Sequence, residues 1–373
     1  MNGKKIYVSR PSIPPFEEFI EEIKPIWEDR MFTNVGERHN RFEQMLCSYL
    51  ESPFITLTVN GHMALELAIE TLGLSGEVIT SPFTFSSTIM SLLRLGLTPV
   101  FCDISEKDLL IDAIKIEEKI TANTSAVMPV HLFGNVCDLE RIEQICCGNG
   151  LISVYDGAHA FGMKYKGKSI SNYGDACMHS FHATKVFHSI EGGVVCFSKA
   201  ENKQKADVIK NFGLIGDEVE YLGFNGKMTD VSAAMGICNL RYFSQNVEKR
   251  KKCALHYDER LSTIAGIRPC VGQPNVVTNY SYYPVVVENE YGSTRDLLCC
   301  YLNENGVFPR KHYVSIANHW RIIKELGLDC ECPVAEDIAQ RILVLPLNQD
   351  LSLEDVDYIC DLIEKFKKSA VNK

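Results

Sequence analysis

Lys185 stands in a setting that could turn a lysine into a nucleophile. It ends the segment Ser180-Phe-His-Ala-Thr-Lys185, which follows a predicted strand and precedes another strand led by Gly192-Gly193. An amine is a useful nucleophile only when its pKa falls well below the ordinary lysine value, and burial beside a ligand has that effect. Most lysines are solvated, so position alone favours an ordinary surface residue. A chemical role therefore depends on what other segments bring to the same place.

Asp156 is a carboxylate at the end of an apolar run that begins at Leu151. We expect it at the carboxyl end of a buried strand, where an unpaired charge is costly and a cationic partner is needed. A protonated pyridine nitrogen is one such partner, and a structural salt bridge to Arg or Lys is the alternative. His159 follows shortly after and is within reach of the same ligand, although a lone histidine is more often a core residue.

The segment Thr58-Val-Asn-Gly-His-Met-Ala-Leu65 predicts the end of a strand, a cap at Asn60, a tight turn at Gly61 and the start of a helix. Free backbone N–H groups and the helix dipole make such a junction a natural seat for phosphate, although these junctions are common. Phe85 follows another predicted strand and could stack on a planar ring, while core packing is the more frequent fate of a phenylalanine.

These segments together supply an amine, an acid for a ring nitrogen, a phosphate seat and an aromatic face. The spacing between Asp156 and Lys185 leaves room for one strand between them. This is the set of groups that a site for pyridoxal 5'-phosphate (PLP) requires. No single segment is decisive, and the prediction rests on their combination.

The elements that must position these residues alternate along the first two thirds of the chain. Short apolar, β-branched runs are separated by stretches with helical periodicity, which predicts an α/β domain with a mainly parallel sheet and ligands at the carboxyl ends of its strands. The predicted strands are Phe54–Val59, Glu77–Thr80, Thr98–Ile104, Ser125–His131, Leu151–Asp156, Cys177–Phe181 and Gly193–Phe197.

The regular alternation of strand-like and helix-like segments ends at about Leu240. We expect residues 1–240 to form the large domain and residues 241–373 to form a smaller α+β domain. The predicted elements of this second part are helices at Asn246–Leu261 and Leu353–Lys367 and strands at Tyr282–Val287 and Ile342–Leu345.

The composition limits the classes of partner. Of the 373 residues, 46% are hydrophobic and 23% are charged, as in a globular protein. The formal net charge of −10 argues against a nucleic-acid partner, because phosphate backbones need a concentrated positive face. The N-terminal stretch has no apolar run of signal-peptide length, and Val78–Ile104 is interrupted by charges and prolines, so we expect no targeting segment and no membrane span.

The cysteines indicate the redox compartment. Fifteen cysteines, an odd number, are scattered and lie mostly in apolar runs. That distribution suits small buried side chains in a reducing cytoplasm better than a disulfide framework, so we expect a cytoplasmic protein. Cys330 and Cys332 are close together, but no second Cys or His pair follows at zinc-like spacing, and we expect no metal site.

Ordered matches along the chain give a resemblance to a known family. From about Ile6 to Ile363 the sequence resembles the sugar aminotransferases of the DegT/DnrJ/EryC1/StrS group. The resemblance implies the aspartate-aminotransferase-like architecture of PLP fold type I, with a large parallel-sheet domain and a small C-terminal domain. The matching segments are Phe32-Thr-Asn34, Asn60-Gly-His-Met-Ala-Leu65, Thr98-Pro-Val100, Pro129-Val-His-Leu-Phe-Gly134, Asp156-Gly-Ala-His159, Ser180-Phe-His-Ala-Thr-Lys185, Glu191-Gly-Gly193, Gly223-Phe-Asn225, Ala233-Ala234 and Leu345-Pro-Leu347.

The resemblance implies roles for single residues around the cofactor ring. Lys185 matches the lysine that forms the Schiff base with PLP, and Asp156 matches the partner of the pyridinium nitrogen. His159 occupies the place of the Gln or His that bonds the ring hydroxyl, and Phe85 resembles the stacking aromatic residue.

The resemblance also implies how the cofactor phosphate is bound. Gly61, His62 and Ser180 match the phosphate-binding positions, and Asn225 resembles an asparagine that the neighbouring subunit contributes, which implies a homodimer with shared active sites. Position 62 usually holds a small hydroxyl residue in this family, so His62 alters a side-chain contact to the phosphate. Gly157 is a milder departure from the usual alanine.

The substrate class follows from the same resemblance. The segments around Lys185 and His159 are most similar to those of transaminases that act on dTDP-4-keto-6-deoxy-D-glucose. We expect L-glutamate as amino donor and a nucleotide-linked keto-6-deoxyhexose as acceptor, in amino-sugar or surface-polysaccharide biosynthesis. A 3-keto-sugar aminotransferase, a PLP-dependent sugar dehydratase and a catalytically silent partner protein stay open as alternatives. The basic turn Arg310–Tyr313 could meet the sugar or the diphosphate, although we expect a solvated turn.

Overall fold

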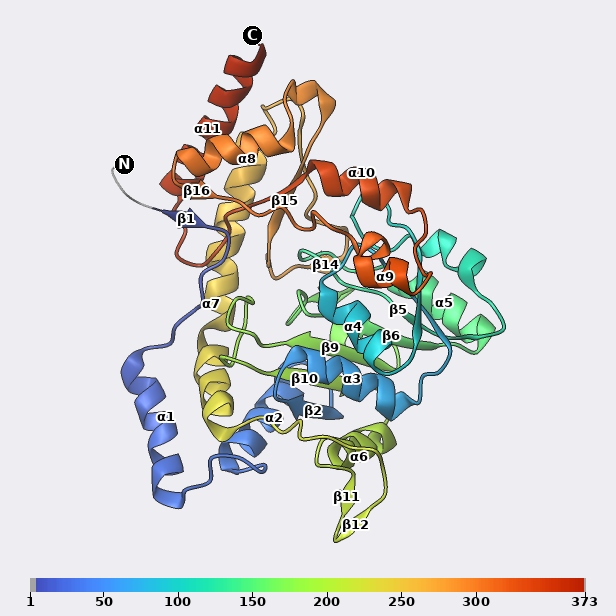
Figure 1. Cartoon of the computed structure of the whole chain (residues 1–373). Coiled ribbons are helices and arrows are strands. Elements are labelled where there is room, and N and C mark those ends of the chain that lie inside the picture. The colour runs from blue at the N-terminus through green and yellow to red at the C-terminus, as the bar shows by residue number, and fades with distance from the viewer. Residues whose placement is uncertain (1–4, 372–373) are drawn as a thin grey trace.

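A seven-stranded sheet lies at the centre of the folded protein (Figure 1). The structure is a computed structural model that describes residues 5–371, so the first four residues, where no targeting signal is expected, lie outside the described part. Within that described part, no helix is both long and apolar enough to cross a membrane.

The strands of the central sheet follow the order β2-β10-β9-β6-β5-β3-β4. Strand β10 is antiparallel to both of its neighbours, and the other pairs are parallel. All seven predicted strands are confirmed. Strands β4 and β5 end three residues earlier than predicted, because the chain turns away after Phe101 and because Pro129 offers no N–H to continue β5. The strands are β2 (Ile55–Thr58), β3 (Glu77–Thr80), β4 (Thr98–Phe101), β5 (Thr124–Met128), β6 (Ile152–Asp156), β9 (Ala176–Ser180) and β10 (Gly193–Phe197).

Apolar layers cover both faces of the sheet, because successive strand residues point to opposite sides. Val195 of β10 packs in one buried cluster with the helix residue Ala68, while Val194 packs in another cluster with Phe42 and Ile237. The helices of this part are α1 (Phe16–Asp29), α2 (Glu37–Tyr49), α3 (Gly61–Leu72), α4 (Ser86–Arg94), α5 (Leu139–Asn149) and α6 (Ala200–Ile209).

The C-terminal part has its own three-stranded antiparallel sheet, β13-β15-β17, and its own buried cluster. Its elements are β13 (Ile267–Pro269), β15 (Tyr283–Val287), α8 (Arg295–Glu304), β16 (Val307–Phe308), α9 (Arg321–Glu325), α10 (Pro333–Arg341), β17 (Ile342–Leu345) and α11 (Leu353–Val371). Shorter strands elsewhere are β7 (Lys164–Tyr165), β8 (Lys168–Ser169), β11 (Leu214–Ile215), β12 (Glu218–Val219) and β14 (Val276–Val277).

Two features join the two parts. Helix α7 runs without a break from Asp230 to Leu261, so it starts well before the predicted Asn246 and passes through residue 240. Strand β1 (Ile6–Tyr7) pairs in parallel with β16, which places the start of the described chain beside the C-terminal part. The division into domains at residue 240 stays a prediction.

The packing of α7 on α2 predicts a stability effect at one glycine. A methyl group added at Gly236 would lie 2.4 Å from Cζ of Phe42, a fully buried ring. We expect Gly236→Ala to lower the free energy of unfolding by about 1–3 kcal/mol, because the ring has no room to move. The midpoint of urea denaturation measures this change.

Gly148 provides the matched control. It also lies in a helix, α5, but a methyl group added there meets no atom within 4 Å. Gly148→Ala should leave the midpoint unchanged or raise stability by up to about 1 kcal/mol. An unchanged midpoint for Gly236→Ala would contradict the described packing of α7 on Phe42.

Candidate active site

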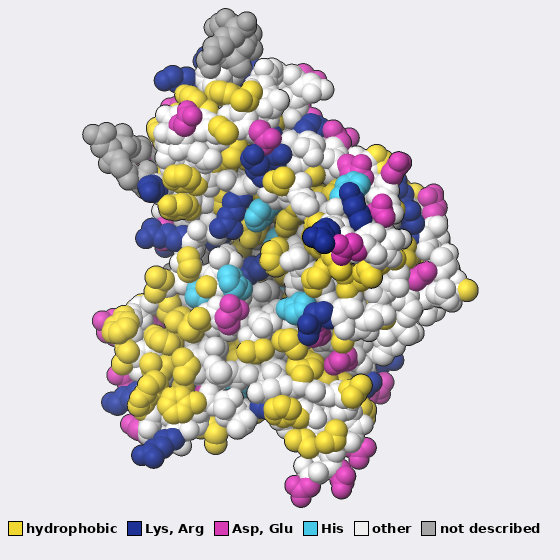
Figure 2. All heavy atoms as spheres, in the orientation of Figure 1, with side chains coloured by type: hydrophobic (Ala, Val, Ile, Leu, Met, Phe, Trp, Pro, Cys, Tyr) yellow, Lys and Arg dark blue, Asp and Glu magenta, His cyan; other side chains and the backbone are white. Residues whose placement is uncertain are grey.

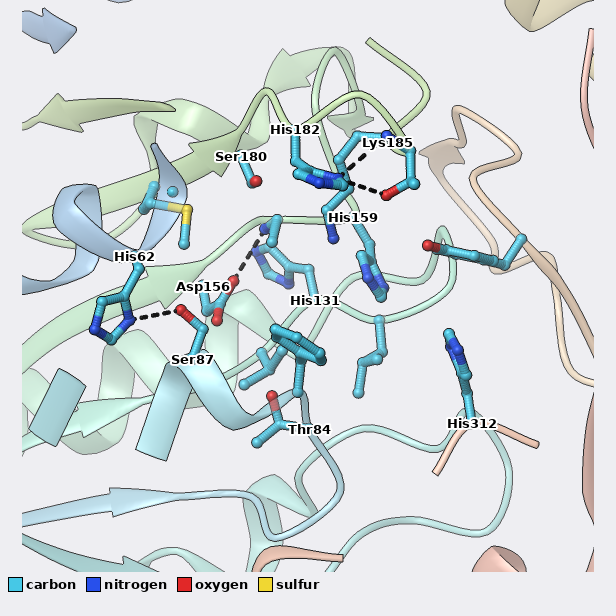
Figure 3. Close-up of a pocket in the computed structure, with 18 of the residues that line it drawn as sticks. His62, Thr84, Ser87, His131, Asp156, His159, Ser180, His182, Lys185 and His312 are labelled. Carbon is cyan, nitrogen blue, oxygen red and sulfur yellow. Dashed lines mark hydrogen bonds between the residues drawn. The ribbon is translucent and has the colours of Figure 1, made fainter. Parts of the chain in front are cut away.

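A cavity of about 490 Å³ opens at the carboxyl ends of the parallel strands. Its walls come from the residues that follow β3, β5, β6 and β9, from the start of α3 and from the C-terminal part. Figure 2 shows histidine side chains gathered around the hollow, and Figure 3 shows the residues that line it. The cavity brings together Lys185, Asp156, His159, Gly61, His62, Phe85 and Ser180, as the sequence predicts.

Asp156 ends strand β6 and is almost completely buried, at 3% exposure. Its carboxylate accepts a hydrogen bond of 2.8 Å from the Thr88 hydroxyl and one of 3.0 Å from the Ala158 N–H. Burial raises the pKa of Asp156, and these two bonds and Lys185 oppose that rise. Among the described side chains Asp156 has no ion-pair partner within salt-bridge distance, so the alternative of a structural salt bridge is not realised. A cation placed beside this carboxylate would stabilise its charged form.

Lys185 is a partly buried residue of the turn that follows β9, and its N–H donates to the His182 carbonyl at 2.9 Å. Burial lowers the pKa of its amine to about 8, and the nearby Asp156 opposes this lowering. An ordinary lysine titrates at about 10.4, so a much larger fraction of Lys185 is neutral and nucleophilic at neutral pH. Lys185 is therefore not a solvated surface residue, although most lysines in proteins are.

His159 is buried beside Lys185 and is neutral, because burial lowers its pKa well below the ordinary histidine value. The Phe133 N–H lies 3.4 Å from its Nδ1, an arrangement that makes Nδ1 the acceptor. The other ring nitrogen, Nε2, then carries the proton and can donate to a ligand.

The start of α3 is the place where the sequence predicts a phosphate seat. The Asn60 side chain caps the helix by accepting from the Met63 N–H at 2.9 Å. A methyl group at Gly61 would lie 2.7 Å from Cβ of Ser180, so only glycine lets the helix approach the end of β9 this closely. The His62 ring is engaged elsewhere, with Nδ1 at 2.8 Å from the Ser87 hydroxyl (Figure 3).

Two further functional candidates, His131 and Thr88, were not singled out from the sequence. His131 follows β5, is fully buried, stacks on Tyr155 and keeps Nε2 without a hydrogen-bond partner among the described groups. Its position after an apolar strand is the same signal that singled out Asp156. Thr88, which donates to Asp156, carries no distinct sequence signal.

The turn at Arg310–Tyr313 is not simply solvated, so that expectation was wrong. His312 and Tyr313 are partly buried and line the cavity with the exposed Arg310. Burial, Arg310 and Lys185 lower the pKa of His312 to about 4. Lys311 instead pairs with Asp296 at 2.5 Å. The turn thus supplies a cationic rim and two rings to the site.

Asn225 is the predicted site residue that this chain does not bring to the cavity. It is exposed and forms an isolated backbone bridge with Asn211, in the loop that leads to α7. Metal ligation is not offered by the described residues either, because no group of three or more His, Cys, Asp or Glu among them is placed to hold a metal ion.

Comparisons with known proteins identify the family of this chain. Residues 16–364 match the model of the DegT/DnrJ/EryC1/StrS aminotransferase family. The chain is 39% identical, over 98% of its own length and 100% of the other protein, to dTDP-4-amino-4,6-dideoxy-D-glucose transaminase of Shigella dysenteriae. The solved structure of DesI in the presence of its TDP-sugar product has a TM-score of 0.93 and 27% identity, covering 99% of this chain and 95% of DesI.

A further solved structure is described as "Putative sugar aminotransferase Spr1654 from Streptococcus pneumoniae, PLP-form". Its TM-score is 0.91 at 26% identity, covering 98% of this chain and 99% of that chain. The fold and these similarities agree with one another. The chain belongs to the DegT/DnrJ/EryC1/StrS aminotransferase family.

The lowered pKa of Lys185 is testable without any cofactor. Trace acetylation of the cofactor-free protein from about pH 6 to about pH 11, followed by peptide mass spectrometry, measures when each amine becomes neutral. The Lys185 peptide should show a midpoint near 8. Asp156→Asn should lower that midpoint further, because the carboxylate favours the charged amine. A Lys185 midpoint near 10.4, the ordinary lysine value, would contradict the described burial.

Proposed function

We propose that this protein is a PLP-dependent aminotransferase that moves an amino group from L-glutamate to the fourth carbon of dTDP-4-keto-6-deoxy-D-glucose. The observation that carries the proposal is that one cavity holds an amine with a lowered pKa, Lys185, and a buried carboxylate, Asp156, that forms no ion pair within salt-bridge distance among the described residues. The neutral amine of Lys185 can react with an aldehyde, and the carboxylate of Asp156 can be stabilised by a protonated ring nitrogen.

The residues of the cavity fit PLP. The seat at Gly61 and Ser180 suits the phosphate, and the exposed Phe85 ring, at 61% exposure, is free to lie against the pyridine ring. The Nε2–H of His159 suits the ring hydroxyl. When bound, PLP supplies an electron sink for the carbon that carries the amino group. The PLP form of Spr1654 supports the choice of cofactor.

The residues of this chain then have distinct tasks. Lys185 holds the cofactor through its amine, and its Nζ accepts and returns the proton once the donor's own amine has displaced it. Asp156 keeps a proton on the ring nitrogen, since its buried charge is stabilised only by a cation there. Thr88 fixes the carboxylate of Asp156 in place.

The sugar nucleotide would bind on the side of the C-terminal part. Arg310 is the exposed cation at this rim and suits a diphosphate, while Tyr282, His312 and Tyr313 offer rings and donors to the sugar. The name of the Shigella relative supports a 4-keto sugar as acceptor. L-Glutamate is the amino donor in this proposal.

We propose further that two copies of the chain form a dimer that completes each site with Asn225 of the partner. Exposed apolar side chains gather on α1 and around the β11–β12 hairpin (Figure 2), where Trp27 is 62% and Leu222 is 91% exposed. A patch of this kind suits a subunit interface.

All fifteen cysteines are free thiols, which supports a reducing, cytoplasmic location.

Substitution of the two charged site residues tests the chemistry. Lys185→Ala should abolish turnover, because no other amine of the cavity can hold the cofactor. Asp156→Asn should slow turnover by about 100-fold or more, because an amide cannot keep the ring nitrogen protonated. Glutamate-dependent turnover is the measurement, and Lys199→Ala, at an exposed position, is the control with unchanged rate. Full activity of Lys185→Ala, with an unchanged circular dichroism spectrum, would overturn the assignment.

The substrate is tested by incubating the protein with PLP, L-glutamate and a panel of keto-sugar nucleotides. We expect 2-oxoglutarate and an aminated sugar in equal amounts, with proton couplings that place the amine on the fourth carbon. An amine on the third carbon would establish the 3-keto alternative. Loss of water without consumption of glutamate would establish a dehydratase, and no product with any sugar would favour the silent partner protein.

Mixed dimers test the shared site. One chain carries Lys185→Ala and the other carries Asn225→Ala, each with its own affinity tag. If Asn225 acts across the interface, one of the two sites has both lesions and the other has none, so about half of the wild-type activity returns. If Asn225 acted within its own chain, activity would not exceed half of that of the Asn225→Ala homodimer.

A further inference from the structure

A second cavity, of about 370 Å³, lies between α2 and α6 and shares no lining residue with the active-site cavity. In Figure 1 these two helices lie on the side of the central sheet away from α11. The cavity is strongly polar. Its lining residues are Asn34, Val35, His39, Asn40, Glu43, Lys203, Asp207, Lys210, Asn211 and Lys227.

The lysines of this cavity outnumber its carboxylates. Lys203 lies 3.3 Å from Glu43 and also pairs with Asp207, which in turn holds Lys210 at 2.9 Å. Lys227 has no carboxylate partner among the described residues. Its amine donates to the Asn211 side-chain oxygen at 2.8 Å. One positive charge is therefore left without a counter-ion.

Lys227 is not a solvated surface lysine that could do without a counter-ion. Its residue is 8% exposed, and Lys210 beside it is 3% exposed. Burial and the charge of Lys210 lower the pKa of Lys227. An anion in the cavity would stabilise the charged form of Lys227, because it would neutralise a cation that water reaches poorly.

His39 gives an independent sign of a missing ligand. Its side chain is fully buried, and neither ring nitrogen has a hydrogen bond of normal geometry among the described groups. Burial and Lys210 lower its pKa to about 3, with Asp207 and Asn40 opposing, so the ring is neutral. A neutral ring offers one donor and one acceptor, and buried polar groups of this kind are nearly always paired.

The loop at the cavity wall is held in an unusual conformation. Val35 has φ of 64°, a left-handed value that a β-branched residue rarely adopts, and Asn34 before it has φ of 67°. The Asn40 amide donates to the Val35 carbonyl at 3.2 Å and so holds this conformation. Such conformations persist where the surrounding structure imposes them, as at ligand sites.

We propose that this cavity is a second ligand site, which binds the phosphate group of a small phosphorylated molecule through Lys227, Lys210 and His39. A phosphate suits the cavity better than a carboxylate because it carries more charge and more acceptor oxygens, and the cavity offers ammonium, imidazole and amide donors together. The residues that line this cavity are separate from those that line the active-site cavity of the same chain.

Calorimetric titration with inorganic phosphate and with pyrophosphate tests the proposal. The protein is used both as purified and after saturation with PLP and reduction with borohydride, which fills the phosphate seat of the active site. We expect one phosphate-binding site per chain that persists after reduction. Lys227→Met should weaken binding at least tenfold, while Lys199→Met, at an exposed position next to α6, should leave it unchanged.

His39→Phe is the second variant. It keeps every lysine and removes only the two unpaired nitrogens, so it should weaken phosphate binding while the protein melts at the wild-type temperature or above. Absence of binding to the reduced wild-type protein would overturn the proposal. So would equal affinity of wild-type, Lys227→Met and His39→Phe proteins, because the phosphate would then sit elsewhere.

Discussion

A buried carboxylate without a counter-ion is the constraint on which the active site depends. Among the residues that the structure describes, the Asp156 carboxylate accepts hydrogen bonds only from the Thr88 hydroxyl and the Ala158 N–H, and burial raises its pKa. A charge in such a place is tolerated when a ligand brings the opposite charge. The same burial lowers the pKa of Lys185 to about 8. One low-dielectric cavity thus prepares both an acid partner and an amine.

The arrangement of the central sheet explains why Asp156 and the segment that ends at Lys185 lie in one cavity. Strands β6 and β9 are parallel neighbours, so their carboxyl ends lie at the same edge of the sheet. Asp156 pairs in register with Met178, and Ser180 follows two residues later at the end of β9. Strand β3 and helix α4 bring Phe85 and Thr88 to that edge, and α3 begins there with Gly61. Ligands at the carboxyl ends of parallel strands are the rule for open α/β sheets. Nothing in this arrangement requires an unusual local fold.

Much of this could be predicted from the sequence, and the failures have physical reasons. Buried strands appear in the sequence as apolar runs, so the strands of the central sheet and the residues at their ends could be predicted. His312 and Tyr313 were assigned to a solvated turn because the pairing that brings them to the cavity is distant in sequence. Strand β1 was missed because two residues carry no periodicity, although they pair with β16.

Helix α7 shows a different limit. Its start at Asp230 is marked by Thr229, whose hydroxyl accepts from the Ser232 N–H at 3.2 Å, but the small residues that follow hide the helical pattern. Asn225 shows a third limit. Its own chain does not bring it to the cavity, and its role in a neighbouring subunit stays a proposal.

The most direct measurement is the site of covalent attachment. Protein saturated with PLP is reduced with borohydride, digested, and analysed by mass spectrometry for pyridoxylated peptides. The described cavity predicts one pyridoxyl group per chain, on the peptide that contains Lys185. Label spread over exposed lysines, or no label at Lys185, would contradict the account.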